Sequence, residues 1–83
     1  MKSISESIKA NEAIFNEYVA EFNRLEARKT TLSENLVNTA GEETIELTKR
    51  ITVLEDELYE IDRTLIQIGN YITTLKRKLR ADF

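Results

Sequence analysis

Apolar residues recur along this chain at alternating spacings of four and three residues, in two long runs. The first run is Ile4, Ile8, Asn11, Phe15, Tyr18, Phe22, Leu25, Lys29, Leu32 and Leu36. The second run is aliphatic throughout: Leu47, Ile51, Leu54, Leu58, Ile61, Leu65, Ile68, Ile72, Leu75 and Leu79. This heptad spacing predicts two long helices, each with one apolar seam.

The segment between the two runs has the residues that end one helix and begin another. Gly41 is the only glycine outside a heptad run, and it suits the left-handed residue that closes a helix. Glu42 and Glu43 follow it, where negative charge is favourable in the first turn of a helix.

Ser3 and Glu6 form a capping box at the start of the first run. We therefore expect helix 1 at about residues 3–39, a turn at about 40–44 and helix 2 at about 45–81, in one domain.

The two runs match each other if the chain folds back about this turn. Every seam position of the first run then lies opposite a seam position of the second, as Leu25 does with Leu58 and Ile8 with Leu75. Unrelated heptad runs would match in this way about one time in seven. The fold class predicted is all-α, an antiparallel helical hairpin.

The same register predicts the residues beside the seam. On one side, Arg28 lies opposite Glu57 as an ion pair, and Ile14 lies opposite Tyr71 as an apolar extension of the core.

On the other side, Glu26 lies opposite Glu55, which is unfavourable for two like charges. Lys29 is one turn away, so its stem can lie in the core while its ammonium group reaches both carboxylates. We expect Lys29 to fix the register of the two helices.

The residues between Lys29 and Thr39 have poor helix propensity. Thr31 and Glu34 could cap a new helix there, which leaves open a break near Thr30 and Thr31 and a chain of three helices.

The composition excludes several kinds of site. The chain has no cysteine, histidine, proline or tryptophan and only two glycines, so disulfides, Cys/His zinc sites and histidine catalysis are excluded. We predict that it is not an enzyme and has no catalytic, cofactor-binding or metal-binding residues. One acidic cluster is interpreted as a solvated face: Glu55, Asp56, Glu57, Glu60 and Asp62.

Charge is unevenly distributed within a net charge of −3. Residues 42–69 have eight acidic and three basic residues, whereas residues 70–83 have four basic residues and one acidic residue. The basic end gives the second hypothesis for function, a protein that binds or sequesters nucleotides or nucleic acid through phosphate contacts. Its candidate phosphate-binding residues are Lys76, Arg77, Lys78, Arg80 and Tyr71.

A single hairpin of this size has a small core, so we expect self-association. The aromatic seam residues Phe15, Tyr18 and Phe22 are bulky for two helices and fit a four-helix core better. Helix 2 also has apolar residues outside the seam, which extend the candidate interface for a homodimer or a protein partner: Ile45, Val53, Tyr59 and Ile66.

The first hypothesis for function is therefore a small protein that dimerises into a four-helix bundle and binds another protein through its helical faces. Short helical hairpins resemble, at the level of the fold alone, small phage and mobile-element proteins that inhibit or scaffold other proteins. An inhibitor, adaptor or assembly factor is the expectation. No membrane-spanning run or signal peptide is found in the sequence, so we expect no membrane partner and a cytoplasmic location.

Overall fold

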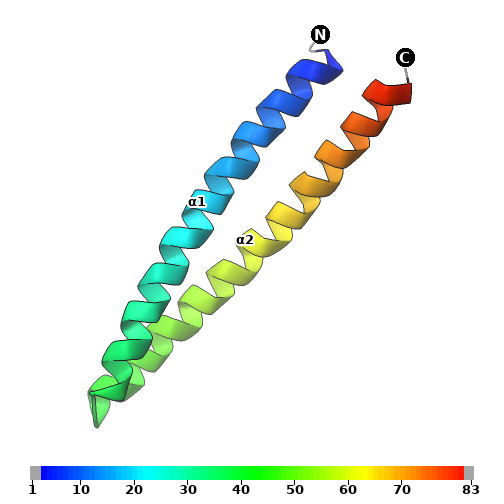
Figure 1. Cartoon of the computed structure of the whole chain (residues 1–83). Coiled ribbons are helices and arrows are strands. Elements are labelled where there is room, and N and C mark those ends of the chain that lie inside the picture. Colours follow the sequence, from blue (N-terminus) through cyan, green and yellow to red (C-terminus); the bar gives the residue numbers. More distant parts are fainter. Residues whose placement is uncertain (1–2, 82–83) are drawn as a thin grey trace.

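The computed structural model describes residues 3–81 as two long helices that run side by side in opposite directions (Figure 1). Helix α1 spans Ile4–Val37 and helix α2 spans Glu42–Ala81. The molecule is elongated, with extents of 64 × 19 × 15 Å, and the turn lies at the end opposite the two termini. The all-α fold with two long helices, consistent with a hairpin, is confirmed.

The first helix begins where the capping residues predict. The N–H group of Glu6 donates a hydrogen bond of 3.1 Å to the Ser3 hydroxyl oxygen, so Ser3 is the N-cap of α1. The charges at the ends of α2 also follow the helix dipole, with Glu42 and Glu43 in its first turn and Lys78 and Arg80 in its last.

The turn has fewer residues than predicted and begins earlier in the sequence. Helix α1 ends at Val37, and α2 already begins at Glu42. Gly41 has the expected left-handed backbone, with φ of 75°, but it precedes α2 directly and does not close α1. The cap of α1 is Asn38, whose N–H bonds the Asn35 carbonyl at 3.1 Å.

No break occurs near Thr30 and Thr31, because α1 is continuous through that stretch. Both threonine hydroxyls donate hydrogen bonds to carbonyl oxygens one turn back, at Glu26 and Ala27. In this rotamer each hydroxyl group finds a partner within the helix and does not compete for a backbone N–H group, so the helical backbone bonds are kept.

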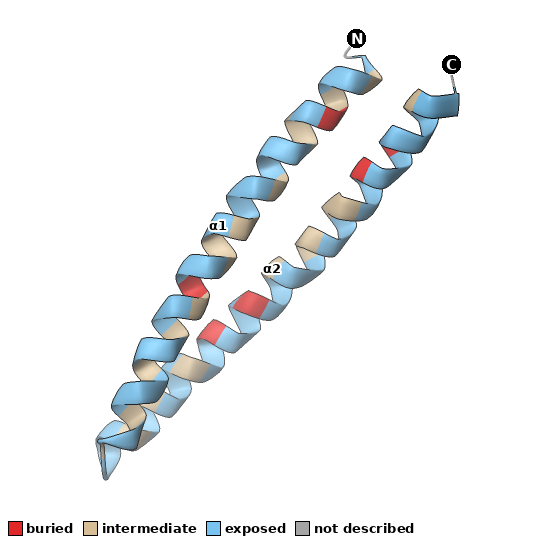
Figure 2. Ribbon diagram, viewed as in Figure 1, coloured by how far each residue is buried: buried red, intermediate tan, exposed pale blue. Residues whose placement is uncertain are grey.

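The core lies between the helices and is divided into two clusters (Figure 2). Near the termini, Ile8 packs with Ile72 and Leu75. Nearer the turn, Leu25 packs with Leu54 and Leu58. Both clusters join residues that the folded-back register places opposite one another, as with Ile8 and Leu75.

Tyr18 is the predicted seam position that the hairpin does not cover, because its side chain is 37% exposed. It lies between the two clusters in sequence, opposite Leu65 in the predicted register. Asn11, the polar seam residue near the termini, is half-buried and donates to the Ser7 carbonyl oxygen at 2.7 Å.

The outer surfaces of both helices are largely exposed (Figure 2). Within residues 3–81, neither helix has an apolar stretch long enough to cross a membrane.

Candidate interaction surfaces

The seam between the helices is open on two sides, because two parallel cylinders cover each other only along one line. Helical spacing assigns each flanking residue to one of these sides. We define the Tyr18 face as the side formed by Ile14, Tyr18, Glu21, Arg24 and Arg28 of α1 and by Arg50, Glu57, Glu60 and Tyr71 of α2. We define the Lys29 face as the other side, formed by Glu12, Glu26 and Lys29 of α1 and by Glu55, Asp62, Gly69 and Lys76 of α2.

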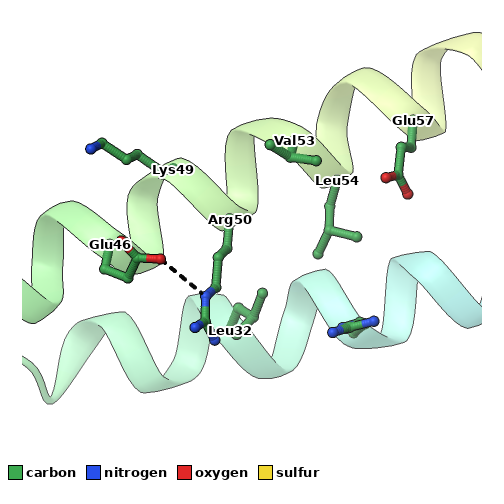
Figure 3. A pocket seen from close by; sticks show the side chains of 8 residues that line it. Leu32, Glu46, Lys49, Arg50, Val53, Leu54 and Glu57 are labelled. Carbon is green, nitrogen blue, oxygen red and sulfur yellow. Dashed lines mark ion pairs between the residues drawn. The ribbon is translucent and has the colours of Figure 1, made fainter.

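A shallow groove near the turn lies on the Tyr18 face (Figure 3). Leu32 and Leu54 point toward each other at its base, and Arg50 extends from α2 toward α1. Arg50 is paired at 3.5 Å with Glu46 of its own helix.

The predicted Arg28–Glu57 ion pair is not formed, although both residues line this groove. Among residues 3–81, the ion pairs join Arg24 to Glu21, Arg50 to Glu46 and Lys76 to Glu12. Exposed ion pairs gain little over hydration, so opposition across the seam does not by itself hold two such flexible side chains together.

Farther from the turn on the same face, Arg24 forms two hydrogen bonds with the carboxylate of Glu21. The guanidinium Nε donates to a Glu21 carboxylate oxygen at 3.0 Å, and a second nitrogen bonds the other oxygen. This hydrogen bonding lowers the pKa of Glu21. The pKa of Arg24 is raised, first by the same hydrogen bond and then by the charges of Glu21 and, from α2, Glu57.

An apolar patch lies on the Tyr18 face in the half nearer the termini. Ile14 is 43% exposed and Tyr71 is 52% exposed, and the predicted register sets them opposite one another, one helical turn from the partly exposed Tyr18. The predicted extension of the core by Ile14 and Tyr71 is therefore incomplete in a single hairpin. Both helices contribute to this patch.

The Lys29 face has a groove lined by more acidic than basic residues. Glu26, Lys29, Glu55 and Asp62 line it over an apolar base, and Lys29 itself is half-buried. The predicted meeting of Lys29 with two carboxylates is seen as a shared groove, without an ion pair within 4.0 Å among residues 3–81.

A second groove on the Lys29 face forms where α2 has a glycine. The ring of Phe15 approaches Gly69 so closely that a Cβ atom there would lie 3.7 Å from Phe15 Cε2. At the end of this groove, Lys76 pairs with Glu12 of the other helix at 3.6 Å. The sequence pattern did not identify this ion pair, because the predicted register sets Glu12 opposite Gly69, seven residues before Lys76.

The seven predicted interface residues do not form one surface. Phe15 and Phe22 pack against the two core clusters within the hairpin. Val53 lines the groove of the Tyr18 face, whereas Tyr59 lines that of the Lys29 face. Three of the seven share a heptad position and form an exposed row along α2, which we name the outer row: Ile45, Tyr59 and Ile66.

The basic end does not converge on one point. Successive residues of a helix are turned by about 100°, so Lys76, Arg77, Lys78 and Arg80 project in different directions around α2. Lys76 is also paired with Glu12. Tyr71 lies seven residues before Lys78, on the same side of the helix, and is half exposed.

The acidic cluster of α2 is likewise divided. Glu55 and Asp62 line the groove of the Lys29 face. Asp56, Glu57 and Glu60 line a groove on the other side, with Glu21 of α1. Among residues 3–81, no group of three or more carboxylates has the geometry to hold a metal ion.

No family model, no curated protein and no solved structure matches this chain.

Proposed function

We propose that this chain is a non-enzymatic helical protein that associates with a second copy into a four-helix bundle and binds another protein through its remaining helical surface. The observation that carries this proposal is the amount of surface that a single hairpin leaves accessible.

The hairpin has 6409 Å² of accessible surface for a mass of 9.6 kDa. A folded monomer of that mass has about 5,100 Å², so the hairpin exposes roughly 1,300 Å² more than a self-sufficient domain. A specific protein interface buries about 800 Å² on each partner, and obligate dimers bury more. The excess is therefore large enough for a stable dimer interface.

The core supports the same proposal. The best-buried side chain, that of Leu25, is still 4% exposed, and among residues 3–81 none is below 2%. Helices of a four-helix bundle bury their seam from two directions, which would complete the burial that one hairpin begins.

A role in binding a different protein is supported by the outer row. Ile45, Tyr59 and Ile66 are each more than half exposed and share one heptad position of α2, outside the a and d positions of the seam. Such an aligned row fits the hydrophobic strip of a partner helix or groove, as an inhibitor, adaptor or assembly factor requires.

Sedimentation velocity at micromolar concentrations tests the association. We expect a dimer of about twice the mass of 9.6 kDa. A monomer throughout, with the helicity of the hairpin retained, would contradict the proposal.

A further inference from the structure

The two open sides of the seam differ in how their charges would meet a second copy. On the Lys29 face, Glu26, Glu55 and Asp62 surround the single Lys29. A second copy set against that face would double this excess of negative charge, which is unfavourable in a desolvated interface.

Each helix of the Tyr18 face carries both signs of charge, but Glu21 of α1 and Arg50 of α2 are paired within their own helices. At the middle of the face, the other charges are cations on α1 and carboxylates on α2. Arg24 and Arg28 lie on α1, and Glu57 and Glu60 lie on α2 at the same distance from the turn. Arg28 and Glu57 line one groove, and the charge of Glu57 raises the pKa of Arg24, so these residues lie at one level of the hairpin.

The same face has the apolar surface that an interface needs. Ile14, Tyr18 and Tyr71 are between 37% and 52% exposed, and Tyr18 lies between the two core clusters in sequence. Tyrosine is favoured at the centre of interfaces, because its ring is buried while its hydroxyl group keeps a polar partner.

This inference rests on the proposed self-association. We propose that the second copy packs against the Tyr18 face, about a two-fold axis parallel to the long axis of the hairpin. That symmetry sets α1 of each copy beside α2 of the other at the same height and in the opposite direction. All neighbouring helices of the bundle are then antiparallel, which is favourable for their dipoles.

The arrangement brings complementary groups together twice, once on each side of the axis. Arg24 and Arg28 of one copy face Glu57 and Glu60 of the other, and Ile14 of one copy packs on Tyr71 of the other. The interface is self-complementary, as a two-fold dimer requires.

The outer row is a poorer surface for a second copy. An antiparallel two-fold pairing of α2 centred between Tyr59 and Ile66 would set Asp62 and Arg63 each beside its own equivalent, where like charges repel. The second copy therefore leaves the outer row free for a different protein.

Two matched double variants test the face. Ile14→Lys with Tyr71→Lys alters the Tyr18 face, and Tyr59→Lys with Ile66→Lys makes the same change of charge on the outer row. By sedimentation velocity, we expect the first variant to dissociate at a concentration at least about ten-fold higher than wild type, and the second to remain dimeric. The reverse result with a dimeric wild type would overturn this inference alone, whereas a monomeric wild type would overturn the association itself.

A mixing experiment tests the symmetry and does not depend on either variant folding alone. Arg24→Glu with Arg28→Glu sets like charges across both halves of the interface, and so does Glu57→Arg with Glu60→Arg. Each protein alone should dimerise at least about ten-fold more weakly than wild type, and an equal mixture should form the mixed dimer, in which every charge pair between the two copies is again complementary. Native mass spectrometry and circular dichroism measure both properties. A mixture that recovers neither mass nor helicity, or single variants that dimerise as wild type does, would overturn the proposal.

Discussion

The two glycines occupy backbone positions with opposite requirements. Gly41 has φ of 75°, a conformation that side-chain-bearing residues adopt only with strain. Gly69 lies within α2, where a missing side chain increases the entropy lost on folding. The close approach of the Phe15 ring to Gly69 leaves room for a methyl group at van der Waals distance, since the nearest atom would be 3.7 Å away.

Gly69→Ala should therefore stabilise the protein by about 0.5–1 kcal/mol, because alanine has the higher helix propensity and fits beside Phe15. Gly41→Ala should destabilise it by about 1–2 kcal/mol, because the left-handed backbone becomes strained. Urea unfolding followed by circular dichroism measures both changes. Equal effects of the two substitutions would contradict the distinct roles given to the glycines.

The ionisation of Glu21 should make the stability of the folded protein depend on pH. Its pKa is lowered in the folded protein by the hydrogen bond from Arg24, so folding favours its ionised form. The resulting stabilisation is present above the pKa of an unfolded glutamate and is lost as the pH falls through the lower pKa of the folded state. Glu21→Gln should destabilise the protein at neutral pH and reduce the loss of stability in acid.

Urea midpoints at neutral and acidic pH, for wild type and Glu21→Gln, test this sign. Glu17→Gln is a suitable control, since it changes the same charge one turn away without a bond to Arg24. If the control reduces the acid dependence as much as Glu21→Gln does, the Arg24 hydrogen bond is not the cause.

At the scale of the elements, heptad spacing was sufficient to predict both helices and the residues that face each other. Leu25 with Leu58 and Ile8 with Leu75 were paired by register alone, and each pair lies in one cluster of the core. The helix ends were less accurate. Gly41 was expected to close α1, but the last carbonyls of α1 are bonded by Asn38 and Thr39, and no heptad position specifies that choice.

The basic end of α2 distinguishes the two hypotheses for function. Arg77→Glu with Lys78→Glu reverses two cations that are favourable at a helix C-terminus, by about 0.3–1 kcal/mol each. If the chain works through its apolar helical faces, this variant loses that stability but keeps its mass in solution. If the end binds phosphates, the variant should lose affinity for nucleotides and oligonucleotides by about ten-fold or more, with a shallower dependence on salt.

Isothermal titration of wild type and variant with nucleotides and short oligonucleotides makes the comparison. Micromolar binding by wild type that the variant lacks would favour the phosphate-binding hypothesis. If neither protein shows a heat of binding, the phosphate-binding hypothesis is excluded for those ligands.

At the scale of the whole molecule, the sequence predicted that the core of a single hairpin is small. It did not predict which seam position the hairpin leaves exposed. Phe15, Tyr18 and Phe22 were expected to contribute alike to an interface, yet only Tyr18 remains exposed, and Gly69 makes room beside Phe15. Spacing along one helix cannot show this, since it depends on which small or large residue the other helix supplies at that height.

If association completes the core, stability must depend on protein concentration. Folding and dimerisation are then one equilibrium, so dilution shifts it toward unfolded monomer by mass action. The melting temperature of wild type should fall steadily across a hundred-fold dilution, and that of Ile14→Lys with Tyr71→Lys should be lower than that of wild type at each concentration. The control Tyr59→Lys with Ile66→Lys should keep the wild-type dependence, because the outer row lies outside the proposed dimer. A wild-type melting temperature that does not change on dilution would mean that the hairpin is stable alone, with its excess surface left for other proteins.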